Sequence, residues 1–367
     1  MIQRWSIVVL SLWVASAAAC APAQAADPPP DVLVGVNYFA GWWEPTPNKW
    51  QGPDGVDWRA EYPQRVPLLG EYNVQETMDR EIAAAADHGV DFFQILWYAA
   101  DGEVRDTARL NAAVEQFMHS PHAHRLKFVI EYCNHRPFGI SDPARWTQCV
   151  NYWVQCMQHP SYLQVDGRPV FKIHGSGAFW EQCGADRAQA RRFLDQLRAA
   201  ARAAGLGTPL IGCGAVGPSR IPAEHWVASV FDYTNEYMNV PDLPAIAQDY
   251  PYEQLAEFEA AWRGGHTADA IPAVPYLGAG WNPRPWGDPR PAFELPSRPQ
   301  WKRALEGLQA ELQQGALGFP AAGGRRQPAV TIYCWNEFGE GGIVAPTRGE
   351  QYMKLEVLRE VFGAPAP

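Results

Sequence analysis

The 367-residue sequence lacks several patterns that mark common classes of protein. No Cys-x-x-Cys pair occurs, so the chain offers no ready zinc site. No Asp-x-Asp motif occurs either, which removes a usual metal-binding signature of enzymes that use sugar nucleotides. The formal net charge is −10, which disfavours nucleic acid as a partner. We therefore expect no metal, no cofactor and no nucleic-acid partner.

Long apolar segments are absent beyond the N-terminus, so we expect no transmembrane span. The N-terminal segment has a basic residue, Arg4, an apolar stretch over 7–19, and Ala23 and Ala25 at a spacing typical of signal cleavage. These features predict that residues 1–25 are an export signal and that residues 26–367 form one periplasmic or extracellular domain. Cys20 follows three alanines, so a lipid anchor at Cys20 is the alternative.

Six further cysteines follow Cys20, and an even number in an exported chain permits disulfides. Their spacing selects no pairing. Cys149 and Cys156 are separated by about two helical turns, roughly 10 Å, which is too far for an easy bridge. The six are Cys133, Cys149, Cys156, Cys183, Cys213 and Cys334.

Short apolar runs alternate with amphipathic segments along the chain. Near-continuous apolar runs are typical of strands buried on both faces, and therefore of a parallel sheet. Eight such strands alternating with helices predict an α/β fold of the (β/α)8 TIM-barrel type. The runs span residues 32–39, 90–98, 127–133, 168–174, 209–215, 230–237, 270–278 and 329–338. Helical patterns span residues 73–89, 141–158, 186–205, 298–315 and 349–363.

Long loops rich in proline, glycine and tryptophan follow the first, sixth and seventh predicted strands, for example over residues 40–58 and 278–299. In a (β/α)8 barrel such loops lie at the C-terminal mouth, where active sites are built. A flat indole ring matches the apolar face of a sugar, and the chain has 16 tryptophans. We interpret these loops as walls of a cleft, with plain packing onto the barrel as the alternative.

Two glutamates, Glu337 and Glu340, follow the last apolar run, and no lysine or arginine lies within five residues of either. If strand alternation continues, Tyr333, Trp335 and Glu337 share the face that points into the barrel. Two carboxylates in one cleft push their pKa values apart, so that one holds a proton and the other is ionised. Glycoside hydrolysis needs this division of labour. On spacing alone, capping a helix or binding a loop amide is the simpler role for either glutamate.

Four segments resemble the glycoside hydrolase family 99-like group, which includes the WbsX-type proteins and, more distantly, the endo-α-mannosidases. The segments are PLLGEYNVQETMDREIAAAADHGVDFFQILWY (67–98), HPSYLQVDGRPVFKIH (159–174), GWNPRPW (280–286) and WNEFGEG (335–341). The resemblance implies a (β/α)8 barrel that acts on a polysaccharide. In the endo-mannosidase branch the first glutamate deprotonates the 2-hydroxyl of the sugar, and the second is the general acid and base, with overall retention. By position these roles fall on Glu337 and Glu340. The mannosidase branch has Trp-His where this chain has Phe338-Gly339, so an α-mannan substrate is not implied.

A barrel brings the ends of all its strands to one rim, which gives a set of candidate substrate-binding residues. We expect His135 and His174 to bind sugar hydroxyls rather than a metal. Glu131 and Glu236 are reserve carboxylates, and Lys172 can point inward and pair with an acid. The candidates are Tyr38, Trp42, Trp43, Trp97, Tyr98, Asn134, His135, His174, Glu236, Tyr237, Trp281, Arg284, Trp335 and Asn336.

Together these features predict an exported glycoside hydrolase whose catalytic residues are Glu337 and Glu340. Three alternatives remain open. A polysaccharide lyase could use His135 with Arg284, a carbohydrate-binding barrel could lack turnover, and a glycosyltransferase would need sugar nucleotides that export makes inaccessible. Arg284 and Arg290 could bind a uronate or sulfate. The motifs leave the sugar, the linkage and the number of subunits open.

Overall fold

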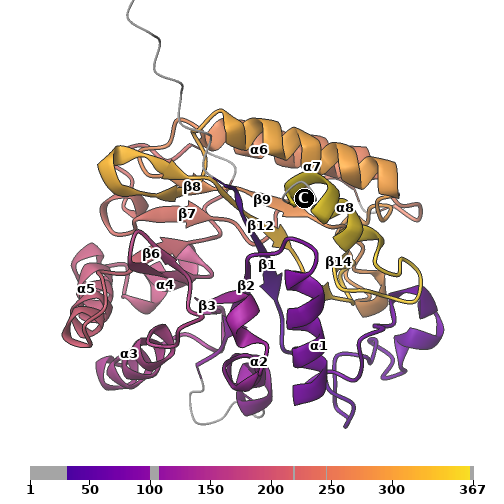
Figure 1. Cartoon of the computed structure of the whole chain (residues 1–367), viewed down its shortest axis with the longest axis horizontal. Coiled ribbons are helices and arrows are strands. Elements are labelled where there is room, and N and C mark those ends of the chain that lie inside the picture. The colour runs from indigo at the N-terminus through magenta and orange to yellow at the C-terminus, as the bar shows by residue number, and fades with distance from the viewer. Residues whose placement is uncertain (1–30, 100–106, 218–219, 245, 364–367) are drawn as a thin grey trace, which may run out of the picture.

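The computed structural model describes residues 31–99, 107–217, 220–244 and 246–363 (Figure 1). The predicted export signal and Cys20 lie outside these residues, so both stay predictions. Within the described ranges, no helix has the length and apolar character needed to cross a membrane. The six described cysteines are buried, and no disulfide joins them.

All eight predicted strands are present and form a nearly closed parallel barrel. The seventh strand is split into β8 and β9, because Pro275 between them has no N–H to donate. β8 pairs with β7, and β9 pairs with β12, which in turn pairs with β1, so the two halves of the seventh strand form the two ends of the sheet. The strands are β1 (Leu33–Tyr38), β2 (Phe92–Trp97), β3 (Lys127–Tyr132), β5 (Arg168–Ile173), β6 (Leu210–Cys213), β7 (Tyr233–Asn235), β8 (Ala273–Val274), β9 (Tyr276–Gly278) and β12 (Ala329–Tyr333).

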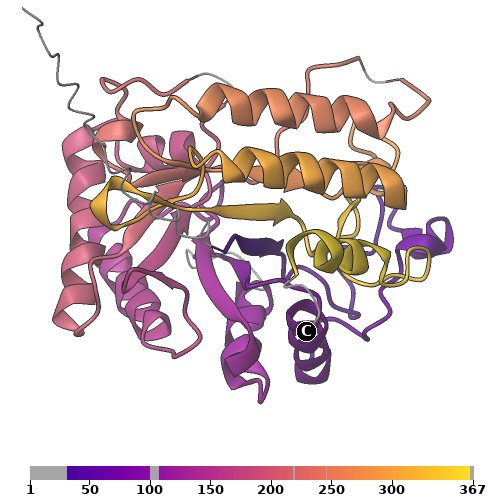
Figure 2. The ribbon, with the colours of Figure 1, turned by 45° about the horizontal axis from the view of Figure 1, so that its top comes forward.

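Helices surround the barrel, as Figures 1 and 2 show from two directions. Each predicted helical segment contains a helix. The helix α3 (Pro143–Met157) begins with a typical N-cap, because the Asp142 side chain accepts a hydrogen bond from the Arg145 amide and Pro143 is the first helical residue. Three helices that the sequence analysis did not single out, α2, α4 and α6, complete the ring. The helices are α1 (Gln75–Ala86), α2 (Thr107–His119), α3 (Pro143–Met157), α4 (Ser176–Gln182), α5 (Arg187–Ala203), α6 (Tyr252–His266), α7 (Arg298–Gln313) and α8 (Met353–Phe362).

Several short strands and 3-10 turns lie outside the main strands and helices. A two-stranded ribbon of β13 (Asn336–Glu337) and β14 (Gly342–Ile343) follows β12 at the C-terminal mouth. In its described residues, the link between β6 and β7 contains only a 3-10 turn, η4 (Val227–Ser229). The remaining elements are β4 (Gln164–Val165), β10 (Phe319–Pro320), β11 (Arg326–Gln327), η1 (Trp58–Ala60), η2 (Pro63–Arg65), η3 (Ala123–Arg125), η5 (Arg284–Trp286) and η6 (Ala322–Gly324).

Candidate active site

A cleft of about 570 Å3 opens at the C-terminal mouth, and both Glu337 and Glu340 line it. The ribbon of β13 and β14 explains their convergence. The carbonyl of Glu337 accepts hydrogen bonds from the amides of Glu340 (3.1 Å) and Gly341 (2.8 Å), which closes a tight turn. Gly341 has a φ of +83°, a conformation that favours glycine. At Gly339 a Cβ atom would come within 2.2 Å of the Trp286 ring, so only glycine fits there.

The Glu337 carboxyl is buried and receives few hydrogen bonds from the protein. Glu337 is only 6% exposed. Oε1 accepts a hydrogen bond from the Tyr237 hydroxyl at 3.2 Å, whereas the buried Oε2 has no hydrogen-bond partner in the described part of the chain. Burial, followed by the nearby charge of Glu340, raises the pKa of Glu337 well above its usual value.

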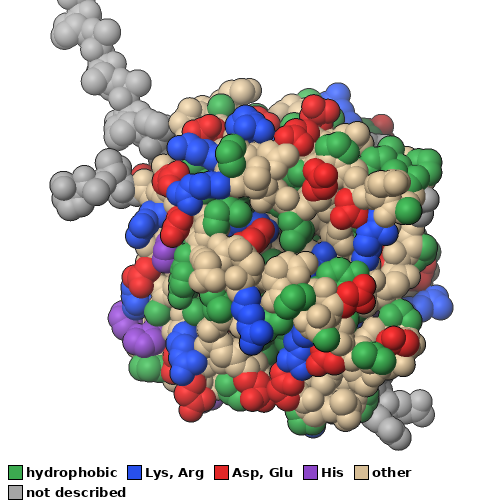
Figure 3. Space-filling view, turned by 90° about the vertical axis from the view of Figure 1, so that its right-hand side faces the viewer, with side chains coloured by type: hydrophobic (Ala, Val, Ile, Leu, Met, Phe, Trp, Pro, Cys, Tyr) green, Lys and Arg blue, Asp and Glu red, His purple; other side chains and the backbone are tan. Residues whose placement is uncertain are grey.

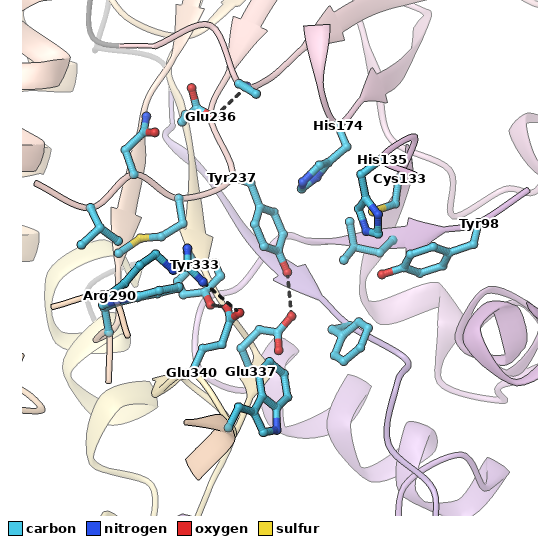
Figure 4. A pocket seen from close by; sticks show the side chains of 18 of the residues that line it. Tyr98, Cys133, His135, His174, Glu236, Tyr237, Arg290, Tyr333, Glu337 and Glu340 are labelled. Carbon is cyan, nitrogen blue, oxygen red and sulfur yellow. Dashed lines mark hydrogen bonds and ion pairs between the residues drawn. The ribbon is translucent and has the colours of Figure 1, made fainter. Parts of the chain in front are cut away.

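The Glu340 carboxyl has more help in carrying a negative charge. Its Oε2 accepts a hydrogen bond from the Tyr333 hydroxyl, and its Oε1 lies 3.9 Å from Nη2 of Arg290 (Figure 4). Burial raises the pKa of Glu340, but the Tyr333 hydrogen bond and the Arg290 charge oppose that rise. Of the two carboxyls, Glu337 is therefore the one whose surroundings favour the protonated form more strongly.

Six of the predicted substrate-binding residues line the same cleft. Figure 4 shows Tyr237 pointing its hydroxyl at Glu337, with the two histidines and Tyr98 on the far side of the cleft from Arg290. The six are Tyr98, His135, His174, Glu236, Tyr237 and Trp281. Glu236 is occupied, because its two carboxyl oxygens accept the amides of Ala215 (2.7 Å) and Val216 (3.2 Å). It is therefore a weaker reserve acid than the sequence suggested.

Tyr38 and Trp335 do not line the cleft. Both point outward to the buried Glu81 of α1, to which the Tyr38 hydroxyl (2.6 Å) and the Trp335 indole N–H (2.8 Å) donate hydrogen bonds. The prediction that Trp335 shares a face with Tyr333 and Glu337 is wrong. The reason is that β12 ends at Tyr333, and strand alternation does not extend beyond the strand.

Trp42 and Asn336 support the site from beneath and do not line it. The Asn336 side chain accepts from the amide of Phe39 (2.8 Å) and donates to its carbonyl (2.7 Å), which ties β13 to the end of β1. The Trp42 indole donates to the Asn336 carbonyl at 2.7 Å and packs against Trp50 and Phe338. These aromatics form the packed base of the loops, the alternative noted for them.

Trp97 and Asn134 are also structural. The buried Trp97 ring packs edge-on against Trp153 of α3, with 5.3 Å between ring centroids. The Asn134 side chain accepts from the Gly175 amide (2.7 Å) and donates to the Gly175 carbonyl (2.9 Å). Both residues therefore fix the ends of barrel strands and stay outside the cleft.

Trp43 and Arg284 lie at the periphery. The Trp43 indole donates to the Pro47 carbonyl at 3.0 Å, and Arg109 stacks on its ring. Arg284 forms an ion pair with Asp249 at 2.7 Å. Neither residue lines the cleft, so the lyase role considered for Arg284 loses its geometric basis.

Several residues that line the cleft were not named as binding candidates, among them Lys49, Trp286 and Tyr333. Lys49 and Trp286 lie in the two long loops that were interpreted as walls, and the Lys49 ammonium lies 4.9 Å from the centroid of the Trp286 ring. Tyr333 was placed on the correct face but was not named as a binding residue. Its position four residues before Glu337 is the signal that could have identified it.

In the described part of the chain, neither the surface charge nor the arrangement of possible metal ligands indicates a further kind of ligand. On the face shown in Figure 3, acidic and basic side chains are interspersed and form no extended patch of one sign. Across the described residues, no group of three or more His, Cys, Asp or Glu side chains is arranged to hold a metal ion.

Comparison with known proteins gives a likeness in fold. No protein-family model and no curated protein sequence matches the chain. Among solved structures, it is similar to a glycoside hydrolase-like protein at 13% identity and a TM-score of 0.60, over 95% of this chain and 98% of that one. It is also similar to the GH99 endo-alpha-mannosidase from Bacteroides thetaiotaomicron, in complex with BIS-TRIS-Propane, at 15% identity and a TM-score of 0.54, over 90% of this chain and 95% of that one. The chain therefore has the barrel fold of these structures, which is the fold that its resemblance implied.

Proposed function

We propose that the protein is an exported glycoside hydrolase that cleaves a polysaccharide with Glu337 and Glu340. The observation that carries this proposal is the convergence of two buried, raised-pKa carboxyls in one cleft at the mouth of a (β/α)8 barrel. Fold likeness to glycoside hydrolases and the predicted export signal support it. Burying two acids side by side is costly, and a purely structural role would not require both.

The contacts suggest how the two acids divide the work. In the implied mechanism Glu337 is the base toward the 2-hydroxyl of the sugar and Glu340 is the acid, with retention. The free protein favours the proton on Glu337. A substrate hydroxyl that donates to the unpartnered Oε2 of Glu337 would lower the pKa of that carboxyl. Substrate binding would thus move the proton toward Glu340 and start the reaction.

The lining of the cleft suits a carbohydrate. Trp281, whose ring centroid lies 4.3 Å from the Arg290 guanidinium, and Tyr98 contribute aromatic rings to the lining, and His135 and His174 add polar groups near Tyr98. Rings of this kind pack on the apolar faces of sugars, while polar groups bind the hydroxyls. A polysaccharide chain could therefore lie across the cleft over the carboxyl pair.

The glycosyltransferase alternative has one sequence feature in its favour, the G-x-G-x-x-G spacing of GCGAVG (212–217). In a nucleotide-binding fold this motif opens a helix whose N-terminus binds phosphate. Here the next described helical element is the short η4, ten residues later. A Cβ atom on Gly214 would lie 2.6 Å from the His174 carbonyl and 2.9 Å from that of Asn235, so this glycine allows strands to approach. The geometry favours hydrolysis.

The proposal is tested by incubating the protein with a panel of plant, algal and bacterial polysaccharides. Hydrolysis adds one water for each bond cleaved, so it predicts saturated products with new reducing ends whose combined mass exceeds that of the substrate by one water per cleavage, detected by mass spectrometry. A 4,5-unsaturated product that absorbs ultraviolet light would identify a lyase instead. Retardation in affinity electrophoresis without any cleavage would identify a binding barrel.

A further inference from the structure

A buried ionic pair lies below the cleft, inside the barrel. Glu131 of β3 and Lys172 of β5 face each other in the parallel register, and Lys172 Nζ lies 3.0 Å from Glu131 Oε1. Both side chains are fully buried. The other carboxyl oxygen, Oε2, accepts hydrogen bonds from Gln94 Nε2 (2.7 Å) and Asn37 Nδ2 (3.2 Å). The pairing of Lys172 with an acid agrees with the expectation from the sequence.

These contacts make Glu131 a fixed anion. Burial alone would raise the pKa of its carboxyl, but the charge of Lys172 and the hydrogen bond from His174 outweigh burial and lower that pKa to about 2. A carboxyl that holds its charge so firmly cannot exchange protons with substrate. Glu131 is therefore unsuited to the reserve catalytic role considered for it.

The same carboxylate determines the state of a histidine that lines the cleft. Nδ1 of His174 lies 2.7 Å from Oε1 of Glu131. An ionised carboxylate only accepts hydrogen bonds, so Nδ1 must carry a proton. In the neutral ring with its proton on Nδ1, Nε2 on the opposite side of the ring is an acceptor.

The position of His174 directs that acceptor to the substrate. The side chain is 22% exposed, in contrast to the fully buried Glu131, and it lines the cleft beside Tyr237 (Figure 4). The two rings lie 4.9 Å apart, and Tyr237 in turn binds Glu337. Tyr237 thus lies between the His174 imidazole and Glu337. The imidazole is on the side of the cleft away from Arg290.

We propose that Glu131 is a positioning residue that holds His174 in the Nδ1–H tautomer, so that Nε2 accepts a hydrogen bond from a hydroxyl of the substrate. That the donor is a sugar hydroxyl rests on the proposed glycosidase function. The arrangement makes His174 a specificity-determining residue. A methyl ether or acetyl ester at that position has no O–H to donate and leaves the imidazole nitrogen unpaired, so the site discriminates against a blocked hydroxyl.

A neighbouring histidine has the same arrangement by a separate contact. Nδ1 of His135 lies 2.9 Å from the Arg136 carbonyl, which can only accept, so this ring also keeps its proton on Nδ1. Burial lowers the pKa of His135, which favours its neutral form. The rings of His135 and His174 lie 6.3 Å apart. This wall of the cleft therefore presents acceptors, which suits hydroxyl donors.

The first test reads the tautomer directly and needs no substrate. Protein labelled with 15N-histidine is examined by long-range 1H–15N correlation near neutral pH, with the His174 signals assigned by their loss in His174→Asn. The proposal predicts a neutral ring with the proton on Nδ1. A ring protonated on Nε2, or on both nitrogens, would overturn it. In Glu131→Gln/Lys172→Met, which removes both charges together, we expect the Nε2–H form to increase, and an unchanged tautomer would also contradict the proposal.

The second test uses the glycan that the wild-type protein cleaves. His174→Asn keeps an amide near the Nδ1 position but removes the cleft acceptor, whereas His174→Gln places a carbonyl near the Nε2 position. We expect kcat/KM to fall about tenfold in the Asn variant and clearly less in the Gln variant, the loss expected for one hydrogen bond. Equal losses in both would overturn the proposal. Arg263→Met/Glu311→Gln removes an ion pair of 2.6 Å between α6 and α7 and serves as the control. If no glycan is cleaved, the glycosidase proposal fails, while the tautomer measurement still decides this one.

Discussion

The hydroxyl of Tyr237 donates a hydrogen bond to Oε1 of Glu337 at 3.2 Å, and a second tyrosine, Tyr333, binds Glu340 in the same way. The two phenol rings meet edge to face with 5.0 Å between their centroids. Tyr237 follows β7 and Tyr333 ends β12, so residues from two different strands each support one carboxyl. Each acid in the cleft therefore has its own donor, and the two donors can be removed separately.

Tyr237→Phe removes the donor to Glu337. Because this hydrogen bond lowers the pKa of Glu337, its loss raises that pKa further. If turnover requires ionised Glu337, the acidic limb of the kcat/KM profile moves to higher pH and activity near neutrality falls about tenfold. Tyr152→Phe, which removes a hydroxyl bonded to Glu115 away from the cleft, should leave the profile unchanged. An unshifted profile in Tyr237→Phe would show that the hydroxyl does not tune Glu337.

Arg290→Ala and Arg284→Ala separate a cleft arginine from a peripheral one. Arg290 lowers the pKa of Glu340 through its charge, so removing it raises that pKa and moves the limb that reports Glu340 to higher pH. Arg284 is paired with Asp249 outside the cleft, and its loss should change kcat/KM less than about threefold, as for an exposed ion pair. The pH dependence of kcat and kcat/KM measures both effects. Equal shifts in the two variants would contradict the assignment.

We expect Glu259 to make the unfolding free energy of the protein depend on pH, independently of catalysis. This buried carboxyl of α6 accepts the Gly278 amide, and burial raises its pKa from 4.5 to about 7. The folded protein thus keeps a proton that the unfolded chain releases, so the associated stability is complete below about pH 4.5 and is lost as pH rises to 7. The difference corresponds to about 3 kcal/mol. Urea unfolding across this pH range should show a smaller loss for Glu259→Gln than for wild type.

The control for that experiment lies on the same helix. Glu257 is exposed, and Glu257→Gln should give a curve of unfolding free energy against pH that runs parallel to that of wild type. If Glu259→Gln also runs parallel to wild type, Glu259 does not bind its proton more tightly in the folded state.

We expect Lys354 to stabilise the turn that carries Glu337 and Glu340. Its buried ammonium donates to the carbonyls of Ala279 and Ile343, both at 2.8 Å, and so joins the loop after β9 to the end of the turn. Lys354→Met leaves both carbonyls unsatisfied and should cost about 3 kcal/mol of unfolding free energy. Lys302→Met removes a 44% exposed ion-pairing lysine and should cost less than about 1 kcal/mol. Comparable losses in urea unfolding would rule out this role for Lys354.

Much of the barrel could be predicted from the sequence because its strands are buried on both faces. That burial gives short apolar runs such as 90–98, which become β2 without ambiguity. The prediction failed where the strand pattern was extended beyond its hydrogen bonds. β12 ends at Tyr333, so Trp335 turns away to Glu81, a contact between residues 254 apart that no local pattern indicates.

The candidate site was predictable only in its outline. The two glutamates were identified from their position after the last apolar run and from the family motif, and the long loops did supply Lys49 and Trp286. Aromatic side chains at strand ends could not be sorted, because Trp281 in the cleft and Trp42 beneath it are equally apolar and equally buried.

The central claim is that Glu337 and Glu340 together carry the reaction. The most direct measurement is the release of reducing sugars by Glu337→Gln and Glu340→Gln, each compared with wild type on the cleaved polysaccharide, with circular dichroism to confirm folding. The proposed mechanism predicts that each substitution alone lowers kcat by at least about a thousandfold, because the two groups act as a unit. Full turnover in either folded variant would contradict it.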